Sequence, residues 1–233
     1  MKIGLIADAH GNLPAFEKAL NILKKYGVSK IFFLGDAVGY IPHLGVLRLL
    51  RKNNIIAVKG NHEDNLIKEN FVNEEMYQFK RCREQLNDDD KNWLTSLPLK
   101  FKLETKGIRL EFSHGSPDAP LTGYLYPDSE LQQYKPSKPT IYFNGHTHWP
   151  MRRKNEFGAF FCNPGSCGLP RDYGGLGSLG IFDTSNHQFQ ILRFEISRIT
   201  LDWLKCCAPI NEGVVELIKR KKADSFLGEI ADE

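Results

Sequence analysis

Short apolar runs recur along the chain, and each of them stops at a cluster of polar residues and glycines. Runs of strand length occupy residues 3–7, 31–34, 55–58, 108–112 and 141–143. A continuous apolar run of this length, bounded by turn residues, is typical of a strand that is buried on both faces. The pattern therefore predicts five buried strands, each followed by a turn that carries polar side chains.

Helical patterns separate the first three of these strands. Residues 13–26 carry apolar side chains three or four positions apart, with Asn12 available as an N-cap and Gly27 beyond the end. Residues 42–53 repeat this spacing before the third strand. Strand, helix and strand in this order form βαβ units, so we expect a parallel α/β arrangement in this half of the chain.

The middle of the chain interrupts this alternation. Residues 65–98 are charged and read as helical, and residues 101–104 and 107–112 read as a hairpin. Residues 115–139 contain repeated prolines and form a stretch long enough for a functional loop. We interpret this loop as a candidate substrate-facing lid.

Strand patterns return in the last third of the chain. They cover residues 159–162, 179–183 and 189–194 and meet through turn signals, so we expect a second sheet with antiparallel members. From residue 196 on, the pattern is that of one or two helices. We expect one domain over residues 1–195, with residues 196–233 packed on it as a helical extension.

Composition places the chain among ordinary globular proteins. With 233 residues, 41% of them hydrophobic and 25% charged, the chain can bury a sizeable core. The formal net charge of +3 is mild and its positive residues are scattered, which argues against a duplex nucleic acid as partner. No apolar run approaches the roughly 18 residues of a membrane span, so we expect no membrane insertion.

Three local features bear on compartment and partners. The five cysteines lack a C-x-x-C pair, which favours free, reduced thiols over disulfides or a thiolate zinc site. Met1 leads directly into a strand too short for a signal-peptide core, so we expect a cytoplasmic protein. We interpret the basic run Lys219, Arg220, Lys221 and Lys222 as the cationic last turn of a helix, in preference to a binding patch.

Aspartate, asparagine and histidine side chains follow all five buried strands. They are Asp8, His10, Asp36, Asn61, His62, His114, His146 and His148. Since the carboxyl ends of the strands of an open α/β sheet form its ligand site, we expect these side chains at one rim. Imidazole, carboxylate and amide groups without a thiolate suit a transition metal better than a pure oxygen-ligand magnesium site.

The motifs D-x-H, G-D, G-N-H-E, H and G-H-x-H follow one another in this order, and the chain resembles the calcineurin-like metallophosphoesterases. The resemblance covers residues 1–183. Residues 35–40 and 163–166 are most similar to the small bacterial and archaeal phosphodiesterases of that superfamily. It implies an α/β fold, a four-layer α/β/β/α sandwich of two mixed β-sheets flanked by helices.

The same resemblance implies two divalent transition metal ions, with manganese foremost and iron, nickel, cobalt or zinc as alternatives. The matching positions are Asp8, His10 and His148 for the first ion and Asn61, His114 and His146 for the second. Asp36 would bridge the two ions. A bridging hydroxide would then attack phosphorus in line, while the ions stabilise the entering and leaving oxygens.

Four further residues are candidates for the reaction. His62 resembles the family's histidine that is not a ligand and that stabilises the transition state or protonates the leaving alkoxide. Glu63 is a candidate to orient His62. Asn12 either contacts the phosphoryl group or caps a helix, and Arg171 either binds phosphate through its planar guanidinium or is a surface residue.

We therefore expect a metal-dependent phosphodiesterase that acts on a small phosphoester, nucleotide-like substrates included. A phosphomonoesterase or a dinucleoside polyphosphate pyrophosphohydrolase is the alternative, because both use the same metal core. A non-catalytic interaction scaffold on the same fold is a third interpretation, although such scaffolds can lose metal-site histidines that are all present here. The sequence leaves a homo-oligomer open.

Overall fold

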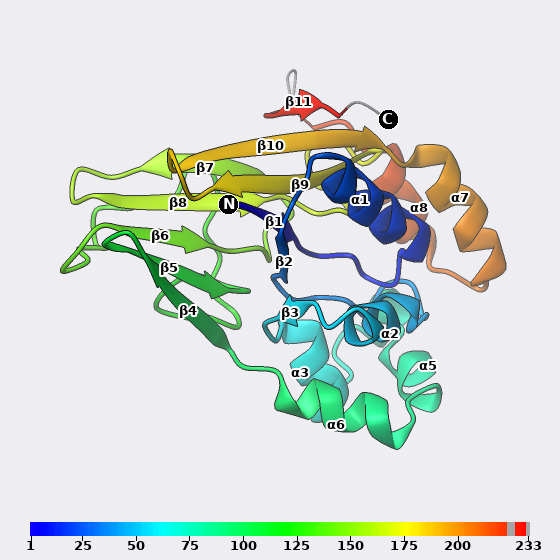
Figure 1. The fold of residues 1–233 in the computed structure, drawn as a ribbon. Helices are drawn as coiled ribbons and strands as arrows, with labels where there is room; N and C mark the ends of the chain where they lie inside the picture. The colour runs from blue at the N-terminus through cyan, green and yellow to red at the C-terminus, as the bar shows by residue number, and fades with distance from the viewer. Residues whose placement is uncertain (223–226, 232–233) are drawn as a thin grey trace.

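The computed structural model describes residues 1–222 and 227–231. Two β-sheets pack against each other and form the strand-rich side of the molecule (Figure 1). The first sheet has the order β11-β10-β9-β1-β2-β3. Its strands are β1 (Lys2–Ile6), β2 (Lys30–Phe33), β3 (Ile56–Ala57), β9 (Leu176–Asp183), β10 (Gln188–Glu195) and β11 (Glu229–Ile230). β1, β2 and β3 pair in parallel, and β9 pairs antiparallel with both β1 and β10.

The second sheet has the order β4-β5-β6-β8-β7. Its strands are β4 (Lys100–Thr105), β5 (Ile108–Ser113), β6 (Thr140–Phe143), β7 (Pro150–Lys154) and β8 (Ala159–Pro164). β5, β6 and β8 pair in parallel, whereas β4 and β7 pair antiparallel at the two edges. Both sheets are therefore mixed, with a parallel centre.

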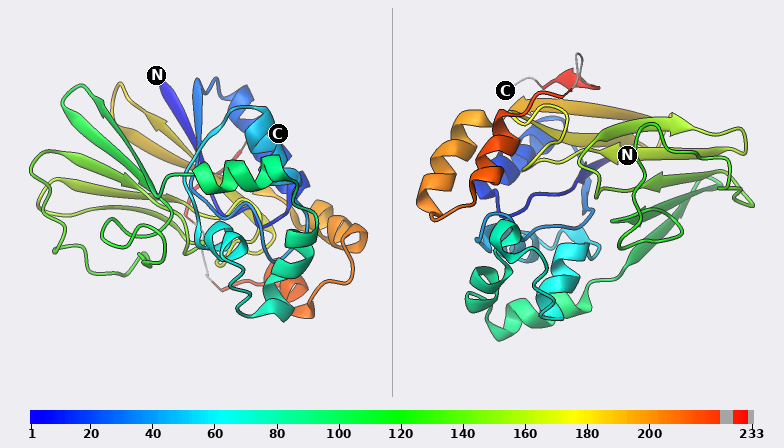
Figure 2. Two further views of the ribbon diagram at one scale, coloured as in Figure 1. Left: turned by 90° about the horizontal axis from the view of Figure 1, so that it is seen from below. Right: turned by 180° about the vertical axis from the view of Figure 1, so that it is seen from behind.

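Helices gather on one side of the molecule and the strands extend to the other (Figure 2). The helices are α1 (Leu13–Lys25), α2 (Gly45–Lys52), α3 (Asn61–Ile67), α4 (Glu74–Tyr77), α5 (Phe79–Glu84), α6 (Asp88–Ser96), α7 (Ser197–Cys206) and α8 (Glu212–Lys219). None of those in the described residues is both long enough and apolar enough to cross a membrane.

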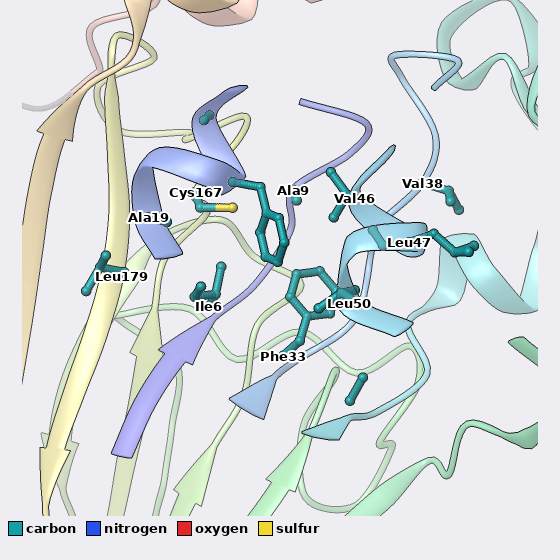
Figure 3. Packing of buried hydrophobic residues seen from close by; sticks show 14 of the residues in the cluster. Ile6, Ala9, Ala19, Phe33, Val38, Val46, Leu47, Leu50, Cys167 and Leu179 are labelled. Carbon is teal, nitrogen blue, oxygen red and sulfur yellow. The ribbon is translucent and has the colours of Figure 1, made fainter. Parts of the chain in front are cut away.

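Alternate side chains of β1 and β2 enter two different cores. Ile3 and Leu5 lie in a cluster with Phe112 of the second sheet, so this core fills the space between the sheets. Ile6 and Phe33 lie in a second cluster against α1 and α2 (Figure 3). Because successive strand residues point to opposite faces, a strand between two cores must be apolar throughout.

The prediction of two mixed sheets flanked by helices is confirmed. Within the described residues, however, the outer face of the second sheet is covered by the loop 115–139 and not by a helix. Leu125 and Leu131 of this loop pack against Met151 and Phe161 of that sheet. The apolar side chains in an otherwise proline-rich stretch thus take over the covering role that we expected of a helix.

Candidate metal centre

The chain turns sharply where the strands end, and the turns use left-handed backbone. Positive φ angles occur at Asp8 (55°), His10 (49°), Asp36 (62°), His146 (69°) and His148 (59°). Residues with a Cβ seldom adopt this conformation, which costs on the order of 1 kcal/mol or more at each position. Such strain is concentrated at functional sites, and here it directs five candidate ligand side chains to one place.

Gly35 and Gly39 permit close contact between the second strand-end loop and two histidines. A Cβ at Gly35, where φ is 92°, would lie 2.8 Å from His114 Nδ1. A Cβ at Gly39, where φ is 86°, would lie 2.1 Å from His62 Nδ1. Both positions therefore require glycine, because any side chain would displace a histidine of the site.

Asp8, His10 and His148 form a first group of ligand atoms. His10 Nε2 and His148 Nε2 are 3.0 Å apart, and His148 Nε2 is 3.7 Å from an Asp8 carboxylate oxygen. All three side chains are buried. The first group thus joins the ends of β1 and of the loop after β6.

Asn61, His114 and His146 form a second group beside the first. His114 Nε2 lies 2.9 Å from Asn61 Oδ1 and 3.0 Å from His146 Nδ1. These residues follow β3, β5 and β6, so three strand ends meet here. The polar residues at the strand ends thus converge on one rim of the protein, as expected.

Asp36 lies between the two groups. Its Oδ2 is 3.7 Å from His10 Nε2 and 3.4 Å from His114 Nε2. Its Oδ1 accepts a hydrogen bond of 3.0 Å from the backbone N–H of His62, which holds the carboxylate in place. A single carboxylate therefore faces histidines of both groups.

Hydrogen bonds to backbone carbonyls set the tautomer of three histidines. The Nδ1 atoms donate over 2.6 to 3.1 Å to carbonyl oxygens, with the pairs His10 to Val38, His114 to Leu34 and His148 to Leu169. When neutral, each of these rings then carries its lone pair on Nε2, toward the site. Carbonyl partners of this kind orient metal-binding histidines in proteins.

This donor set fits a bound cation. In their neutral forms, His10 and His148 point two lone pairs at each other across 3.0 Å, an arrangement that a cation between them would relieve. In the second group, His146 Nδ1 and His114 Nε2 likewise approach each other to 3.0 Å. Ring nitrogens that converge in this way in two adjacent groups fit coordination of a metal.

The pKa values follow from burial and from Asp36. Burial lowers the pKa of His10 and of His148 well below the usual range and lowers that of His146 to about 3, which favours the neutral form that binds metals. Burial also lowers the pKa of His114, but the charge of Asp36, a hydrogen bond to Asp36 and the charge of Asp8 together outweigh burial and raise the pKa to about 9. Burial raises the pKa of Asp36, yet His114, together with the charges of His62 and His10, outweighs burial and holds the pKa well below the usual value. The carboxylate of Asp36 thus favours the protonated form of His114 within the site.

His62 follows Asn61 in the first turn of α3 and packs among aromatic rings. Its ring stacks on Tyr40 at 5.4 Å and meets Tyr77 edge to face at 4.7 Å. Its Nε2 is 3.9 Å from Asp36 Oδ2, and its Nδ1 has no hydrogen-bond partner in the described residues. The ring is held by packing and leaves its nitrogens for other contacts.

Glu63 does not contact His62 in the way we expected. Its buried carboxylate accepts hydrogen bonds from the backbone N–H groups of Asp36 (2.8 Å), Ala37 (2.7 Å) and Gly60 (2.8 Å). It therefore holds the loop that carries Asp36 and closes the N-terminus of α3. The correction has a physical cause, since unpaired N–H groups at a turn and at a helix start compete strongly for a nearby carboxylate.

Asn12 is a helix cap and a tether. Its Oδ1 accepts from Ala15 N–H (3.4 Å), and its amide donates to Gly168 O (2.9 Å) and Thr200 Oγ1 (2.8 Å). The side chain is fully buried. Its hydrogen-bonding groups are already engaged inside the protein, so the contact with a phosphoryl group that we considered is not supported.

A cleft of about 450 Å³ opens onto the two groups. Its lining residues include Asp36, Asn61, His62, His146 and His148, with Tyr40, Tyr77, Thr147, Trp149 and Arg171, the loop residues Tyr124 and Tyr126, and the tail residues Arg220 and Lys222. The sequence interpretation missed the two tail residues. The run 219–222 is basic throughout, so no spacing in the sequence distinguishes these two residues from Lys219 and Lys221.

Comparisons with known proteins agree with this site. The family model described as a calcineurin-like phosphoesterase superfamily domain matches residues 1–187. An uncharacterized protein of Methanocaldococcus jannaschii is 32% identical over 215 residues, which cover 83% of this chain and 87% of that protein. Phosphodiesterase YfcE of Escherichia coli is 27% identical over 195 residues, which cover 78% of this chain and 88% of YfcE.

A solved structure also matches over almost its whole length. The metallophosphoesterase from Sphaerobacter thermophilus is 27% identical to this chain, with a TM-score of 0.75, and the match covers 94% of this chain and 98% of that one. Fold, family model and the convergence of histidines and aspartates at the strand ends point the same way. The chain therefore belongs to the calcineurin-like phosphoesterase superfamily and is a metal-dependent phosphoric ester hydrolase.

Proposed function

We propose that the chain is a phosphodiesterase that works with two divalent metal ions. The observation that carries this proposal is the position of Asp36, whose Oδ2 lies 3.7 Å from His10 Nε2 and 3.4 Å from His114 Nε2. A carboxylate between two sets of imidazoles is suited to bridge two cations. Two ions therefore account for the donor set better than one.

The ligand sets follow from the two groups of side chains. We assign Asp8, His10 and His148 to one ion, Asn61, His114 and His146 to the other, and Asp36 to both. Bound ions supply Lewis acidity at the phosphoryl oxygens and make a nucleophile available at neutral pH. The residues themselves contribute preorganisation, because left-handed turns and carbonyl hydrogen bonds hold their positions before substrate binds.

We assign to His62 the transfer of a proton to the leaving alkoxide. Its imidazole lines the cleft, its Nδ1 has no hydrogen-bond partner among the described residues, and its Nε2 lies 3.9 Å from Asp36 Oδ2. Burial lowers the pKa of His62 and the charge of Asp36 raises it. A bound anionic phosphoester acts in the same direction as Asp36 and favours the protonated, acid form.

We assign to Arg171 a contact with a phosphate group of the substrate. Its side chain lines the cleft, where Nη2 donates to Tyr40 Oη over 2.7 Å and the guanidinium lies over the Tyr40 ring. This hydrogen bond to Tyr40 uses one N–H group of the Arg171 guanidinium, so other N–H groups can bind an anion. A planar guanidinium pairs well with phosphate oxygens.

The preference for diesters rests on similarity to Phosphodiesterase YfcE and on the stretches 35–40 and 163–166. One observation favours a different candidate, a phosphomonoesterase or a dinucleoside polyphosphate pyrophosphohydrolase. Arg220 and Lys222 add positive charge to the cleft, and both alternatives act on more highly charged substrates. Substrate comparison must decide between them.

Manganese is our proposal for the native metal, with iron, nickel, cobalt and zinc as alternatives, because imidazole and carboxylate ligands accept all of them. We also propose a cytoplasmic location. The five cysteines are free, which suits a reducing compartment. Residues 196–233 are proposed to be an extension of a single domain.

The deciding experiment removes the metals and restores single metals one at a time. Metal-stripped protein should be inactive, and activity should return as two equivalents bind. Under one metal condition, kcat/KM should be larger for bis(p-nitrophenyl) phosphate than for p-nitrophenyl phosphate or a dinucleoside polyphosphate. A preference for either of the latter two replaces the diesterase with the corresponding alternative, and saturation at one equivalent refutes the bridging role of Asp36.

A further inference from the structure

The segment 220–222 follows α8 and runs beside the loop 172–174. The backbone N–H of Lys222 donates to the carbonyl of Asp172 over 2.8 Å, and the carbonyl of Arg220 accepts a second bond of the same length from the loop. This short antiparallel contact replaces the helical last turn that we had predicted for the basic run. The tail is thereby held in extended form at the cleft.

Because the backbone of residues 220–222 is extended, its successive basic side chains point to opposite sides. Arg220 and Lys222 line the cleft, whereas Lys221 Nζ lies 5.5 Å above the Tyr173 ring. Successive residues of a strand point to opposite faces, so the contact sends two of these three cations to the cleft. Lys221, which lies between Arg220 and Lys222 in the sequence, therefore serves as a matched control.

A buried ion pair fixes the loop on which the tail rests. Arg193 binds the Asp172 carboxylate through two hydrogen bonds of 2.6 and 3.0 Å, and both side chains are buried. Arg193 also donates to the carbonyl of Leu176 over 2.9 Å. Bidentate pairs of this kind are strong and geometrically specific. Because Arg193 lies on β10, the first sheet holds the loop that the tail contacts and so determines where the tail lies.

The cleft carries more positive than negative charge. Arg171, Arg220 and Lys222 line it, and Asp36 is the one carboxylate among its described lining residues. In the described part of the chain, none of these three cations forms an ion pair. Burial and the nearby charge of Arg171 both lower the pKa of Arg220, which indicates that the two guanidinium groups repel each other. An anion between them would remove this cost.

Aromatic rings and cations lie beside different metal-ligand groups. Tyr124 stacks on His146 at 4.0 Å and on Tyr126 at 5.6 Å, next to the second group. The backbone N–H of Arg171 donates to the carbonyl of His148 over 3.4 Å, next to the first group. The cleft thus offers a planar surface near one group and positive charge near the other.

We infer that the cleft binds a nucleotide-like phosphodiester that carries a second phosphate group, and that Arg171, Arg220 and Lys222 bind this second phosphate. The inference rests on the proposed phosphodiesterase function. A diester has one negative charge, which metal ions bound at the strand ends would already balance. The three further cations therefore match an additional phosphate. A terminal phosphate has up to two charges and three acceptor oxygens, which suit two guanidinium groups and an ammonium. Tyr124 and Tyr126 would then receive the base.

Two chromogenic diesters test this inference, because they differ only in the second phosphate. They are thymidine 5′-(p-nitrophenyl phosphate) and its 3′-phosphorylated form, which release the same nitrophenolate. Wild-type, manganese-loaded enzyme should show a kcat/KM at least about tenfold higher for the 3′-phosphorylated compound. The ratio of the two values should fall about tenfold in Arg220→Gln and about threefold in Lys222→Gln, because Lys222 is more exposed. Lys221→Gln should keep the wild-type ratio.

The outcomes separate this inference from the proposed function. Equal kcat/KM for the two compounds in the wild type overturns the second-phosphate site and leaves the phosphodiesterase standing. An unchanged ratio in both Arg220→Gln and Lys222→Gln, or an equal fall in Lys221→Gln, also overturns it. Turnover of neither compound by metal-loaded enzyme overturns the proposed function itself and the inference with it. Circular dichroism of each variant verifies that it is folded.

Discussion

The strand ends and the C-terminal tail contribute side chains to one cleft, but they differ in how these side chains are held. Asp8, His10 and Asp36 are almost completely buried and are bound by hydrogen bonds from distant loops. Arg220 is half-buried, and Lys222 is exposed. Buried groups with fixed partners suit the reaction that a family has in common. Exposed cations on a separate segment are suited to determine which substrate is preferred.

The supports of the two regions differ as well. The loop that carries Asp36 is held by Glu63 and by backbone hydrogen bonds from Asp8 and His10 (both 3.0 Å). The tail rests on the short contact with the loop 172–174. We therefore expect substitutions at the strand ends to abolish reaction or metal binding, and those at the periphery of the cleft to alter substrate preference.

Replacement of Asp36 by alanine should give the largest effect. The change removes the carboxylate that faces both ligand groups, so we expect both metal equivalents to be weakened and kcat/KM for bis(p-nitrophenyl) phosphate to fall by about 10³-fold or more. Elemental analysis after reconstitution, together with kinetics, measures both quantities. Asp89→Ala is the control, because this side chain is 82% exposed. Retention of one full equivalent in Asp36→Ala contradicts the bridging assignment.

Replacement of His62 by alanine should be the next largest. Its proposed role lies in proton transfer, so turnover should fall by about 10²-fold while the metal content is kept. The loss should be greater for an alkyl leaving group than for nitrophenolate, which leaves without protonation. His187→Ala, on the turn between β9 and β10, serves as control. An equal loss for both leaving groups assigns His62 to electrostatic stabilisation.

Glu63→Gln should have an intermediate effect on turnover, because Glu63 positions the loop that carries Asp36. Glutamine has a single acceptor oxygen, and its NH₂ group would face backbone N–H donors that the carboxylate now satisfies. We expect a loss of about 2 kcal/mol in the free energy of unfolding and about tenfold in turnover. Urea denaturation and kinetics test this, with exposed Glu84→Gln as control. Unchanged stability would show that these hydrogen bonds contribute little.

Tyr124→Ala should have the smallest effect and should depend on the substrate. The ring is 57% exposed, so we expect kcat/KM for thymidine 5′-(p-nitrophenyl phosphate) to fall only about fivefold. Methyl p-nitrophenyl phosphate, which lacks the nucleoside, should be affected less. Phe157→Ala removes an exposed ring between β7 and β8 and is the control. A fall of equal size for both substrates refutes base stacking on Tyr124.

Several features followed from the sequence because their causes are local. Continuous apolar runs at β1 and β2 predicted strands between two cores, and polar residues after each strand predicted a shared rim. A helix cap was one of the two interpretations of Asn12, since an asparagine before a helical pattern satisfies the first N–H groups of that helix. These inferences depend on backbone periodicity and on residue chemistry alone.

Other features depend on contacts between segments far apart in the chain. The partners of Glu63 were misjudged because its carboxylate reaches N–H groups of another loop, and residue spacing carries no information on that distance. The loop 115–139 covers a sheet face because Leu125 and Leu131 fit there. Likewise, Asp172 and Arg193 decide that the basic tail leaves its helix and reaches the cleft. The sequence by itself determined the strands, the family and the chemistry of the rim, whereas tertiary packing decided which cations and rings surround it, since only the folded chain sets those distances.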